Sequence, residues 1–322
     1  MVAHKVVITD NIFPNLEMER RRLSAVGAEL IEADPQADML TQVKDADVII
    51  NVYYKITADL IENLEKCRLI IRNGIGFDTI DVAAASKKGI MVANVPTYCQ
   101  DEVATHTATL ILACSRKITY LNHKVKAGSW DYKLAEPINA PRVSTVGLVG
   151  FGRIAQTVRA KIKCFGFRVI SFDPYVSQEQ ADKHDITMVD MDTLIRESDY
   201  ISIHCPLTDA TRHSFNYETF KQMKPTAFLI NTSRGAVVKE KELVRALEEG
   251  LIAGAALDVL ETDGIDLNNP LCHMDNVIIT PHAAWYSEQS IIQRREDTME
   301  SVIRVLRGGE PVSFINKDAL KG

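Results

Sequence analysis

Short apolar runs alternate with segments of helical periodicity from the start of the chain. The run KVVITD precedes a segment in which Leu16, Leu23 and Val26 fall on one helix face. The alternation continues through AELIEA, DVIINVY, ADLIENLEK, RLIIRNG and IMVANV. Apolar strands that alternate with helices are typical of a parallel sheet covered on both faces. We therefore predict that residues 1–98 belong to one α/β unit.

The next segment has the apolar spacing of one long helix. From Gln100 to about Lys126 the pattern is helical throughout, and the residues expected on one face are Val103, Thr107, Leu110 and Ile111. The polar stretch that follows contains Trp130 and two prolines, which together predict a loop or an arm.

At Ser144 the alternation of strands and helices resumes and predicts a second, larger α/β unit. Its apolar runs are STVGLVG, FRVISFD, DITMVD, YISIHCP, AFLINTS, AGAALDV and NVIITPH. One further helix is expected from Glu288 to about Gly308, because the Gly308-Gly309 pair is a typical helix end. The fold class predicted for the whole chain is α/β, with two doubly wound parallel sheets.

The composition argues against several classes of protein. The 322 residues are 46% hydrophobic and 25% charged, which is the ordinary globular mix. The 37 lysines and arginines against 43 acidic residues give a net charge of −6, which argues against a nucleic-acid partner. No run approaches the roughly 18 apolar residues that cross a bilayer, so no membrane association is expected. The first residues, MVAHKVVITD, lack the apolar core of a signal peptide.

The six cysteines are scattered and form no Cys-x-x-Cys pair. Several of them, including Cys114 and Cys205, lie inside apolar runs, as buried free thiols do. Buried free thiols are typical of a reducing compartment. We therefore expect a cytoplasmic protein without a disulfide framework, and we predict no metal site.

The sharpest motif is a glycine-rich turn between a strand and a helix. The segment VGLVGFGRIA matches G-x-G-x-x-G/A on Gly150, Gly152 and Ala155. The first glycine permits a tight turn, the second lets the backbone approach a pyrophosphate, and the small third residue allows close helix–strand packing. The amide groups at the helix N-terminus then face the phosphates. The motif predicts a dinucleotide site.

An acidic residue stands where such a site needs one. The next strand, FRVISFD, ends in Asp173, 18 residues after Ala155. A carboxylate there accepts hydrogen bonds from the adenosine ribose and repels a 2′-phosphate, and no arginine follows that would bind this phosphate. We therefore predict NAD(H) rather than NADP(H). The alternative is a packing glycine loop followed by an unrelated surface aspartate.

Three polar residues follow later strands of the second unit, at the edge where open α/β sheets bind ligands. Arg234 follows AFLINTS, Asp263 lies after AGAALDV, and His282 ends NVIITPH. Each has an ordinary alternative: a solvated arginine, a turn aspartate and a hydrogen-bonded loop histidine. Together they supply a permanent cation for a carboxylate and a group that titrates near neutral pH.

These residues stand in SRGAVV, GAALDVLETD and TPHAAWYSEQS, which together with GFGRIA and NGIGFDTID resemble the D-2-hydroxyacid dehydrogenase family. The resemblance runs from about Lys5 to Gly309 and is especially near the branch that includes the C-terminal binding proteins. It implies a hydride transfer between NAD(H) and a 2-oxo or D-2-hydroxy acid. It also implies a Rossmann coenzyme domain, residues 99–286, inserted in a flavodoxin-like substrate domain made of residues 1–98 and 287–322.

The resemblance also assigns roles to residues. It implies that Arg234 holds the substrate carboxylate, that His282 is the general acid and base, and that Asp263 is the acidic partner of His282. The coenzyme contacts that it implies are Gly150, Gly152, Arg153, Ile154, Asp173, Cys205, Pro206, Thr232, Ser233, Arg234, Asp258 and His282. The turn that it implies for the substrate carboxylate is formed by Asn73, Gly74, Ile75 and Gly76.

One position departs from the family pattern. The family usually has Glu where this chain has Asp263, 29 residues after Arg234. Because Asp is one methylene shorter, its contact with His282 needs a loop shift, a bridging water or a different partner. Glu261 is the natural substitute, and Asp263 is the assignment we prefer.

The remaining expectations concern substrate and partners. Tyr53 and Trp285 are candidates for a pocket that accepts an apolar or aromatic 2-oxo acid, and the alternative for Trp285 is packing on the next helix or on a subunit. Residues 117–143 resemble the dimer arm of the family, which implies a homodimer. Two other functions stay open: an NAD(H)-responsive scaffold similar to a corepressor, and a phosphoglycerate dehydrogenase of the same family.

Overall fold

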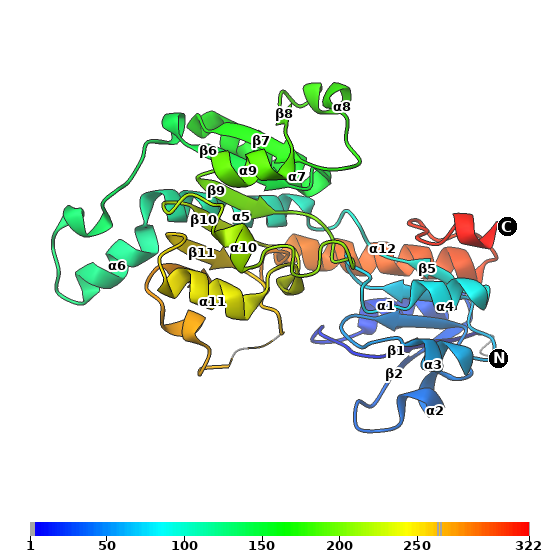
Figure 1. The fold of residues 1–322 in the computed structure, drawn as a ribbon. Coiled ribbons are helices and arrows are strands. Elements are labelled where there is room, and N and C mark those ends of the chain that lie inside the picture. Colours follow the sequence, from blue (N-terminus) through cyan, green and yellow to red (C-terminus); the bar gives the residue numbers. More distant parts are fainter. Residues whose placement is uncertain (1–3, 263, 265, 322) are drawn as a thin grey trace. The chain divides into compact units, whose positions relative to one another are not determined.

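The chain forms two compact α/β units, each built on a parallel sheet (Figure 1). The computed structural model describes residues 4–262, 264 and 266–321. The first unit consists of the chain up to Cys99 and again from Ser287, and the second unit is Gln100–Tyr286. The prediction of two doubly wound α/β units is confirmed.

The first unit has a five-stranded sheet in the order β2-β1-β3-β4-β5. This is the flavodoxin-like order, in which the direction of winding reverses between β1 and β3. Its elements are β1 (His4–Ile8), α1 (Glu17–Ser24), β2 (Ala28–Glu32), α2 (Met39–Val43), β3 (Val48–Asn51), α3 (Ala58–Glu62), β4 (Leu69–Arg72), α4 (Val82–Lys87), β5 (Met91–Ala93), α12 (Glu288–Leu306) and the 3-10 helix η6 (Asp318–Leu320).

Helices cover both faces of this sheet. Val6 and Ile8 of β1 face α1 and α12, whereas Val7 between them faces α2, α3 and α4. The same alternation of side chains holds along β3 and β4. Since both faces are buried, these strands are almost continuous apolar runs, which is the pattern that predicted them.

The last long helix completes the first unit. The Ser287 side chain accepts the N–H of Ser290 and so caps α12, which buries residues such as Met299 and Val302 against the sheet. Gly308 then takes a left-handed conformation (φ 84°), and the N–H of Gly309 donates to the Arg304 carbonyl. The predicted glycine helix end is therefore confirmed.

The second unit has a seven-stranded sheet in the order β12-β11-β10-β9-β6-β7-β8, the Rossmann order extended by one strand. The winding reverses between β6 and β9. Its elements are α5 (Gln100–Arg116), α6 (Ile118–Lys126), η1 (Tyr132–Ala135), η2 (Pro141–Val143), β6 (Thr145–Val149), α7 (Arg153–Ile162), η3 (Lys163–Phe165), β7 (Arg168–Phe172), α8 (Gln178–Asp182), β8 (Thr187–Met188), α9 (Met191–Glu197), β9 (Tyr200–Ile203), α10 (Tyr217–Phe220), β10 (Phe228–Asn231), η4 (Gly235–Val237), α11 (Glu240–Glu248), β11 (Gly254–Leu257), η5 (Pro270–His273) and β12 (Val277–Ile279).

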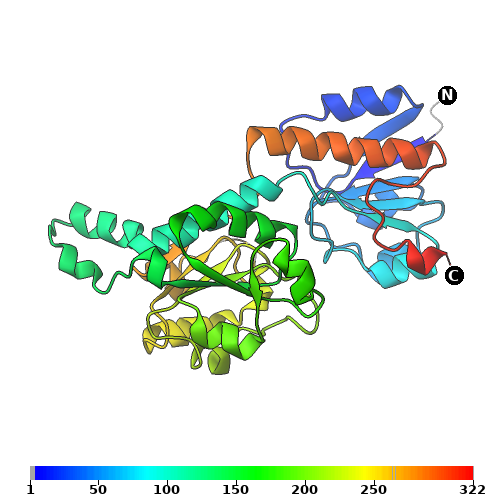
Figure 2. The same ribbon diagram turned by 90° about the horizontal axis from the view of Figure 1, so that it is seen from above.

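The prediction of one long helix from Gln100 to about Lys126 is wrong in one respect, because the helix is broken at Lys117. This residue has a left-handed conformation (φ 48°), so α5 ends at Arg116 and α6 starts in a new direction. Residues 117–143, which we call the arm, extend away from the sheet of the second unit (Figure 2). α6 has no buried residue, whereas α5 packs on the second sheet.

A search of residues 4–262, 264 and 266–321 finds no helix with the length and apolar character that crossing a bilayer requires.

Candidate active site

Six strands of the second sheet end in one row. The residues paired along this row are Phe172, Val149, Ile203, Asn231, Leu257 and Ile279. Because the strands are parallel, the segments that leave the row emerge at the same edge of the sheet. The predicted residues that follow within three positions are Asp173, Gly150, Gly152, Cys205, Pro206, Thr232, Ser233, Arg234, Asp258 and His282. The fold thus brings these ten candidates to one edge of the sheet.

The glycine turn has the shape that a pyrophosphate needs. Gly150 is left-handed (φ 91°), and a Cβ on it would lie 2.9 Å from the backbone nitrogen of Cys205. Gly152 caps α7 and has no atom within 4 Å of the place where its Cβ would be, so the space beside it is open. Ala155 is fully buried in the core. Arg153 and Ile154 form the first turn of α7, whose N–H groups are available to an anion.

Asp173 stands beside this turn at the end of β7. Its carboxylate accepts the N–H of Phe151 at 2.8 Å and the N–H of Tyr175 at 2.9 Å. These bonds hold the carboxylate at the glycine turn, where the sequence predicts the adenosine ribose. Each oxygen retains a lone pair that can accept from a ribose hydroxyl.

A buried asparagine builds the loop that carries Arg234. Asn231, the last residue of β10, is fully buried; its Nδ2 donates to the Arg234 carbonyl at 3.0 Å and its Oδ1 accepts from the Ser233 N–H at 3.0 Å. Gly235 follows, and a Cβ on it would lie 1.7 Å from the Leu260 carbonyl oxygen. Sequence reasoning missed Asn231, although an amide at the end of the apolar run AFLIN is a usable signal.

Three other coenzyme candidates are fixed by polar contacts at the same edge. The Thr232 hydroxyl lies 2.8 Å from the hydroxyl of Thr107 in α5, and the Ser233 hydroxyl donates to the Cys205 carbonyl. Burial raises the pKa of the Cys205 thiol to about 11, so the thiol stays protonated and unreactive at neutral pH. Cys205 is therefore unsuited to nucleophilic chemistry at neutral pH.

His282 has an unusual backbone conformation. It is left-handed (φ 53°), which is uncommon for a residue with a Cβ and marks a constrained position. Its N–H donates to the carbonyl oxygens of Asp258 at 2.8 Å and Thr280 at 3.0 Å. The histidine is thus held directly against the end of β11.

The Asp258 carboxylate organises the turn around His282. It is buried, and it accepts from the Thr280 hydroxyl at 2.5 Å and from the N–H groups of Ala283 at 2.9 Å and Ala284 at 3.0 Å. His106 of α5 completes the cluster, with its Nε2 3.1 Å from the Thr280 hydroxyl. Asp258 was predicted only as a coenzyme contact, and sequence reasoning missed Thr280 and His106.

The sequence offers two candidates for an acidic partner of His282. Asp263, the preferred candidate, lies outside the described residues. Glu261, the alternative, has its carboxylate committed elsewhere: one oxygen lies 2.6 Å from His213 Nε2, and the other accepts the N–H of Glu240 at 3.1 Å. The Glu240 carboxylate in turn accepts the N–H of Glu261 at 2.8 Å. Glu261 therefore ties its loop to α11.

The substrate candidates of the first unit also follow the carboxyl ends of parallel strands. Asn73, Gly74, Ile75 and Gly76 come directly after β4, and Tyr53 follows β3. Gly74 has a φ of 149°, a backbone conformation that residues with a Cβ rarely adopt, so the position favours glycine. The amide of Asn94 donates to the Ile75 carbonyl at 2.6 Å.

Two aromatic candidates differ in their surroundings. Tyr53 is 43% exposed, its ring lies 5.9 Å from the Arg72 guanidinium, and its N–H donates to Asp10. The Trp285 ring meets the Tyr286 ring edge to face at 5.8 Å. Trp285 thus packs on its neighbour in the chain, while Tyr53 contacts Arg72 and is partly exposed.

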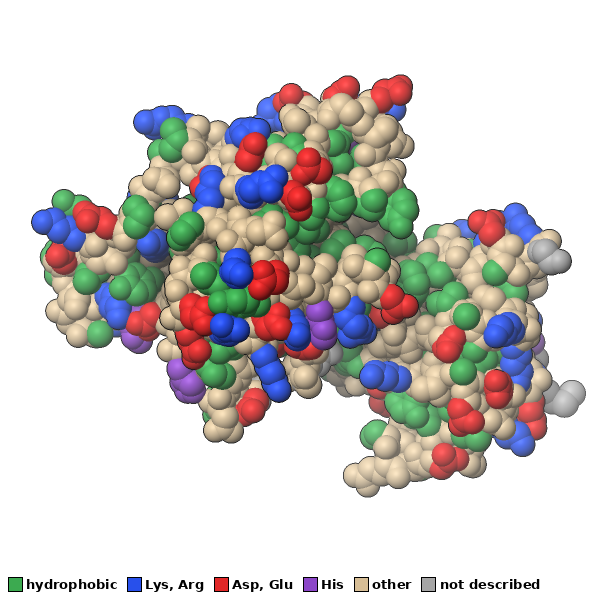
Figure 3. All heavy atoms as spheres, in the orientation of Figure 1, with side chains coloured by type: hydrophobic (Ala, Val, Ile, Leu, Met, Phe, Trp, Pro, Cys, Tyr) green, Lys and Arg blue, Asp and Glu red, His purple; other side chains and the backbone are tan. Residues whose placement is uncertain are grey.

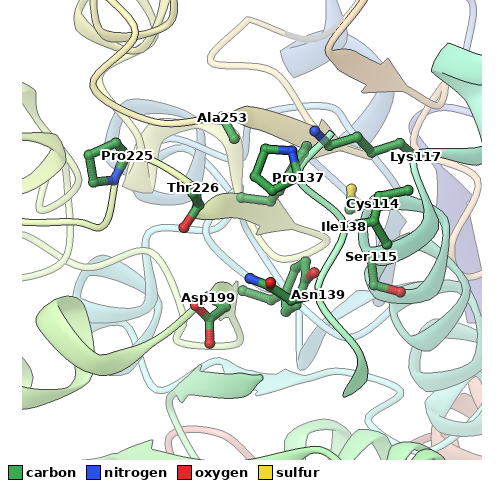
Figure 4. A pocket seen from close by; sticks show the side chains of 12 residues that line it. Cys114, Ser115, Lys117, Pro137, Ile138, Asn139, Asp199, Pro225, Thr226 and Ala253 are labelled. Atoms are coloured by element: carbon green, nitrogen blue, oxygen red, sulfur yellow. The ribbon is translucent and has the colours of Figure 1, made fainter. Parts of the chain in front are cut away.

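A pocket at the opposite edge of the second sheet does not belong to this site. Figure 4 shows the side chains that line it, among which Asp199, Thr226 and Ala253 come just before β9, β10 and β11. It borders the arm through Pro137 and Lys117. Ligands of open α/β sheets bind beyond the carboxyl ends of the strands, whereas this pocket lies at the amino ends.

Comparison with known proteins gives a consistent result. Residues 108–284 match the family model described as D-isomer specific 2-hydroxyacid dehydrogenase, NAD binding domain. The chain is 38% identical over 315 residues to a D-3-phosphoglycerate dehydrogenase of Methanocaldococcus jannaschii; this covers 97% of the chain but 59% of that longer relative. It is 35% identical over 333 residues to a glyoxylate reductase of Thermofilum pendens, covering 100% of the chain and 97% of the relative.

A solved structure agrees over nearly the same length. The D-lactate dehydrogenase of Aquifex aeolicus, in complex with NAD and lactic acid, superposes with a TM-score of 0.87 at 30% identity and covers 96% of this chain and 98% of its own. The predicted family and NAD as the coenzyme are confirmed, and the reaction class is that of the family. This chain belongs to the NAD-dependent D-isomer specific 2-hydroxyacid dehydrogenase family.

Proposed function

We propose that this protein interconverts a small 2-oxo acid and its D-2-hydroxy acid, with His282 as the general acid and base and Arg234 as the carboxylate anchor. One observation carries the proposal: the glycine turn, Arg234 and His282 all leave the same row of strand ends. A hydride transfer needs a nicotinamide, a carboxylate anchor and a proton donor within one small volume.

Arg234 is suited to hold the substrate. Its guanidinium is planar and permanently charged, so it can bind a carboxylate by two parallel hydrogen bonds and polarise the adjacent carbonyl. The buried amide of Asn231 fixes the backbone of its loop, which limits the orientations open to the side chain. A lysine at this place would keep the charge but lose the planar fork.

His282 is suited to move the proton. In reduction its imidazolium gives a proton to the carbonyl oxygen of the substrate, and in oxidation the neutral ring takes that proton back. When bound, NADH supplies the hydride that reaches the carbonyl carbon. The Asp258 carboxylate fixes the turn that carries His282, so the backbone from which the ring projects is held in place before substrate binds.

The acidic partner and the substrate loop complete the proposal. Asp263 is proposed to favour the charged form of His282, since Glu261 is already bound to His213. Asn73, Gly74, Ile75 and Gly76 are proposed to receive the substrate carboxylate, and Tyr53 and Trp285 to set the preference for an apolar or aromatic side chain. Asp173 is proposed to select NAD(H) over NADP(H) through the ribose.

A homodimer is proposed from the arm. Trp130, Tyr132 and Val143 are 90%, 76% and 70% exposed, and Figure 3 shows apolar side chains on this part of the surface. An exposed apolar segment of this kind is a typical protein interface. Replacing Trp130 and Tyr132 by serine should convert a dimer to a monomer in light scattering, and an unchanged mass would refute this use of the arm.

The location is proposed from the cysteines. All six are free, and Cys99 and Cys114 are buried. Thiols that persist without pairing are typical of a reducing compartment, which favours the cytoplasm.

The reaction is tested with a panel of acids and both coenzymes. Glyoxylate, pyruvate, phenylpyruvate, a branched 2-oxo acid and 3-phosphohydroxypyruvate would be compared by the loss of NADH or NADPH absorbance. The chirality of the product would be measured for every acid except glyoxylate, whose product is achiral. We expect a D-hydroxy acid, a preference for NADH, and a higher kcat/KM for phenylpyruvate or the branched acid than for glyoxylate. A preference for glyoxylate would refute the proposed apolar pocket but not the proposed reaction.

Two outcomes of the panel favour the other functions. Turnover confined to 3-phosphohydroxypyruvate indicates a phosphoglycerate dehydrogenase. Tight NADH binding without turnover of any acid indicates an NAD(H)-responsive scaffold, and it would contradict the proposed reaction.

A further inference from the structure

A fully buried arginine lies next to the loop proposed to hold the substrate carboxylate. Arg294 of α12 is 1% exposed, and its Nε donates to Oδ1 of Asn73 at 2.5 Å. Asn73 is itself buried and is the first residue after β4. The two residues are 221 positions apart in the chain, so α12 returns to the first unit to make this contact.

Two aromatic rings hold the guanidinium in place. Its central carbon lies 5.4 Å from the centre of the Phe13 ring and 5.6 Å from the centre of the Tyr98 ring. Both distances are within the range of a cation–π contact, which is strongest where water is excluded. An arginine keeps its charge when buried, so a permanent positive charge is fixed within hydrogen-bond distance of Asn73.

The contact fixes which way the Asn73 amide faces. A guanidinium can only donate, so the oxygen of the amide must face Arg294 and its NH₂ must face away. The backbone of the loop is tied at the same place, because the Asn73 N–H donates to the Asn51 carbonyl at 2.8 Å and the Gly74 carbonyl accepts the Val95 N–H at 2.9 Å. The loop therefore starts from a rigid base.

We propose that Arg294 is a positioning residue that sets the affinity of the loop Asn73–Gly76 for the substrate carboxylate. It acts in two ways: it orients the Asn73 amide, and its charge makes the loop more favourable for an anion. It does not itself contact the substrate. This inference rests on the proposed function, in which that loop binds the carboxylate.

The next residue on α12 is a matched control. Arg295 lies 5.0 Å from the same Phe13 ring, but its guanidinium forms two contacts of 2.6 Å with the carboxylate of Glu19, which is buried. Arg295 thus shares its helix and its contact with Phe13 with Arg294. Unlike Arg294, it pairs with an acid and not with the loop. We expect its removal to cost stability without changing the loop, because its partner is Glu19 and not Asn73.

The test compares R294M, R294K and R295M. Methionine keeps most of the volume of the side chain, and lysine keeps the charge without the planar fork. For each variant we would measure KM for the best 2-oxo acid, the inhibition constant of oxamate as an unreactive analogue, the Kd of NADH and the thermal midpoint. KM and the oxamate constant should rise by about tenfold to a hundredfold in R294M and by less in R294K.

Two further results are expected if Arg294 acts on the loop. R295M should lower the thermal midpoint at an unchanged KM, and the Kd of NADH should change by less than about twofold in all three variants. A wild-type KM and oxamate constant in R294M would overturn the inference, as would an equal rise in R295M. A loss confined to kcat or to the active fraction would also overturn it, because it indicates a merely structural role.

Failure of the proposed function would be seen before any variant is made. If the wild-type protein reduces no 2-oxo acid and does not bind oxamate, the proposed reaction fails and this inference fails with it. If the wild type is active and R294M resembles it, only the inference fails.

Discussion

Both sheets reverse their winding once, and the two places of reversal are used in opposite ways. In the second unit the loops after β6 and β9 meet at Gly150, where a Cβ would lie 2.9 Å from the Cys205 nitrogen. The neighbouring Gly152 is open to solvent or to a ligand. In the first unit the loops after β1 and β3 meet at Asp10, whose carboxylate accepts the N–H groups of Val52, Tyr53 and Tyr54.

The difference shows how one architecture can either present or hide an anion site. Backbone N–H groups beyond a parallel sheet attract negative charge. In the second unit the glycines leave these groups accessible to a pyrophosphate, whereas in the first unit the Asp10 carboxylate already occupies them. Topology alone therefore predicts two ligand sites, and the side chains at the reversal decide which unit takes the dinucleotide.

The largest expected effect is at Gly150. In Gly150→Ala the new Cβ meets backbone and the residue has a left-handed φ, so we expect a loss of about 3 kcal/mol or more in the free energy of unfolding. NADH binding should be lost as well. Gly152→Ala is the control: its backbone is ordinary (φ −73°) and its surroundings are open, so NADH affinity should fall with little change in stability. Equal stability of the two variants in urea would contradict this account of the turn.

The second expected effect is at Asp10. Asp10→Ala removes the acceptor of three N–H groups. The N–H of Val52 is buried and cannot bond to water instead, so we expect the free energy of unfolding to fall by about 2 kcal/mol. Asp10→Asn keeps one oxygen and should lose less. The Kd of NADH should stay unchanged in both variants. A parallel fall in NADH affinity would contradict the claim that only the reversal in the second unit serves the dinucleotide.

A smaller effect is expected from His204, which follows β9. Burial lowers the pKa of its ring to about 4, and its Nε2 lies 2.9 Å from the Ser202 hydroxyl. Below about pH 6.5 the unfolded chain binds a proton that the folded chain does not, so this contribution is complete above that pH and is lost as the pH falls toward 4. At most about 3 kcal/mol is involved.

Urea unfolding at several pH values tests the role of His204. His204→Asn should flatten the fall in stability between pH 6.5 and pH 4, because the variant has no buried ring to protonate. Wild type and His204→Asn with the same slope would show that His204 does not remain neutral in the folded chain.

The sequence predicted the parts of the fold that local patterns encode. The apolar runs marked both buried sheets, and the glycine turn was found because its spacing follows directly from the geometry of a strand–turn–helix. Arg234 and His282 were found because they follow such runs. The registers then place their strands, β10 and β12, on either side of β11 in one row.

The parts that were missed depend on contacts between distant segments. Lys117 has no glycine or proline to signal a break, yet it takes a left-handed conformation that divides the expected helix. Asp258 was recognised as a candidate, but its role in fixing the turn of His282 required the positions of Thr280 and Ala284. The contact between Arg294 and Asn73 joins residues 221 positions apart, which no local pattern can show.

The central claim is that His282, held at the common edge of the second sheet, transfers the proton of the reaction. The most direct measurement is the comparison of kcat with the Kd of NADH in His282→Gln. We predict that kcat falls by about a thousandfold while the Kd of NADH changes by less than about threefold. A kcat within about tenfold of wild type, or an equal loss in both quantities, would contradict the account.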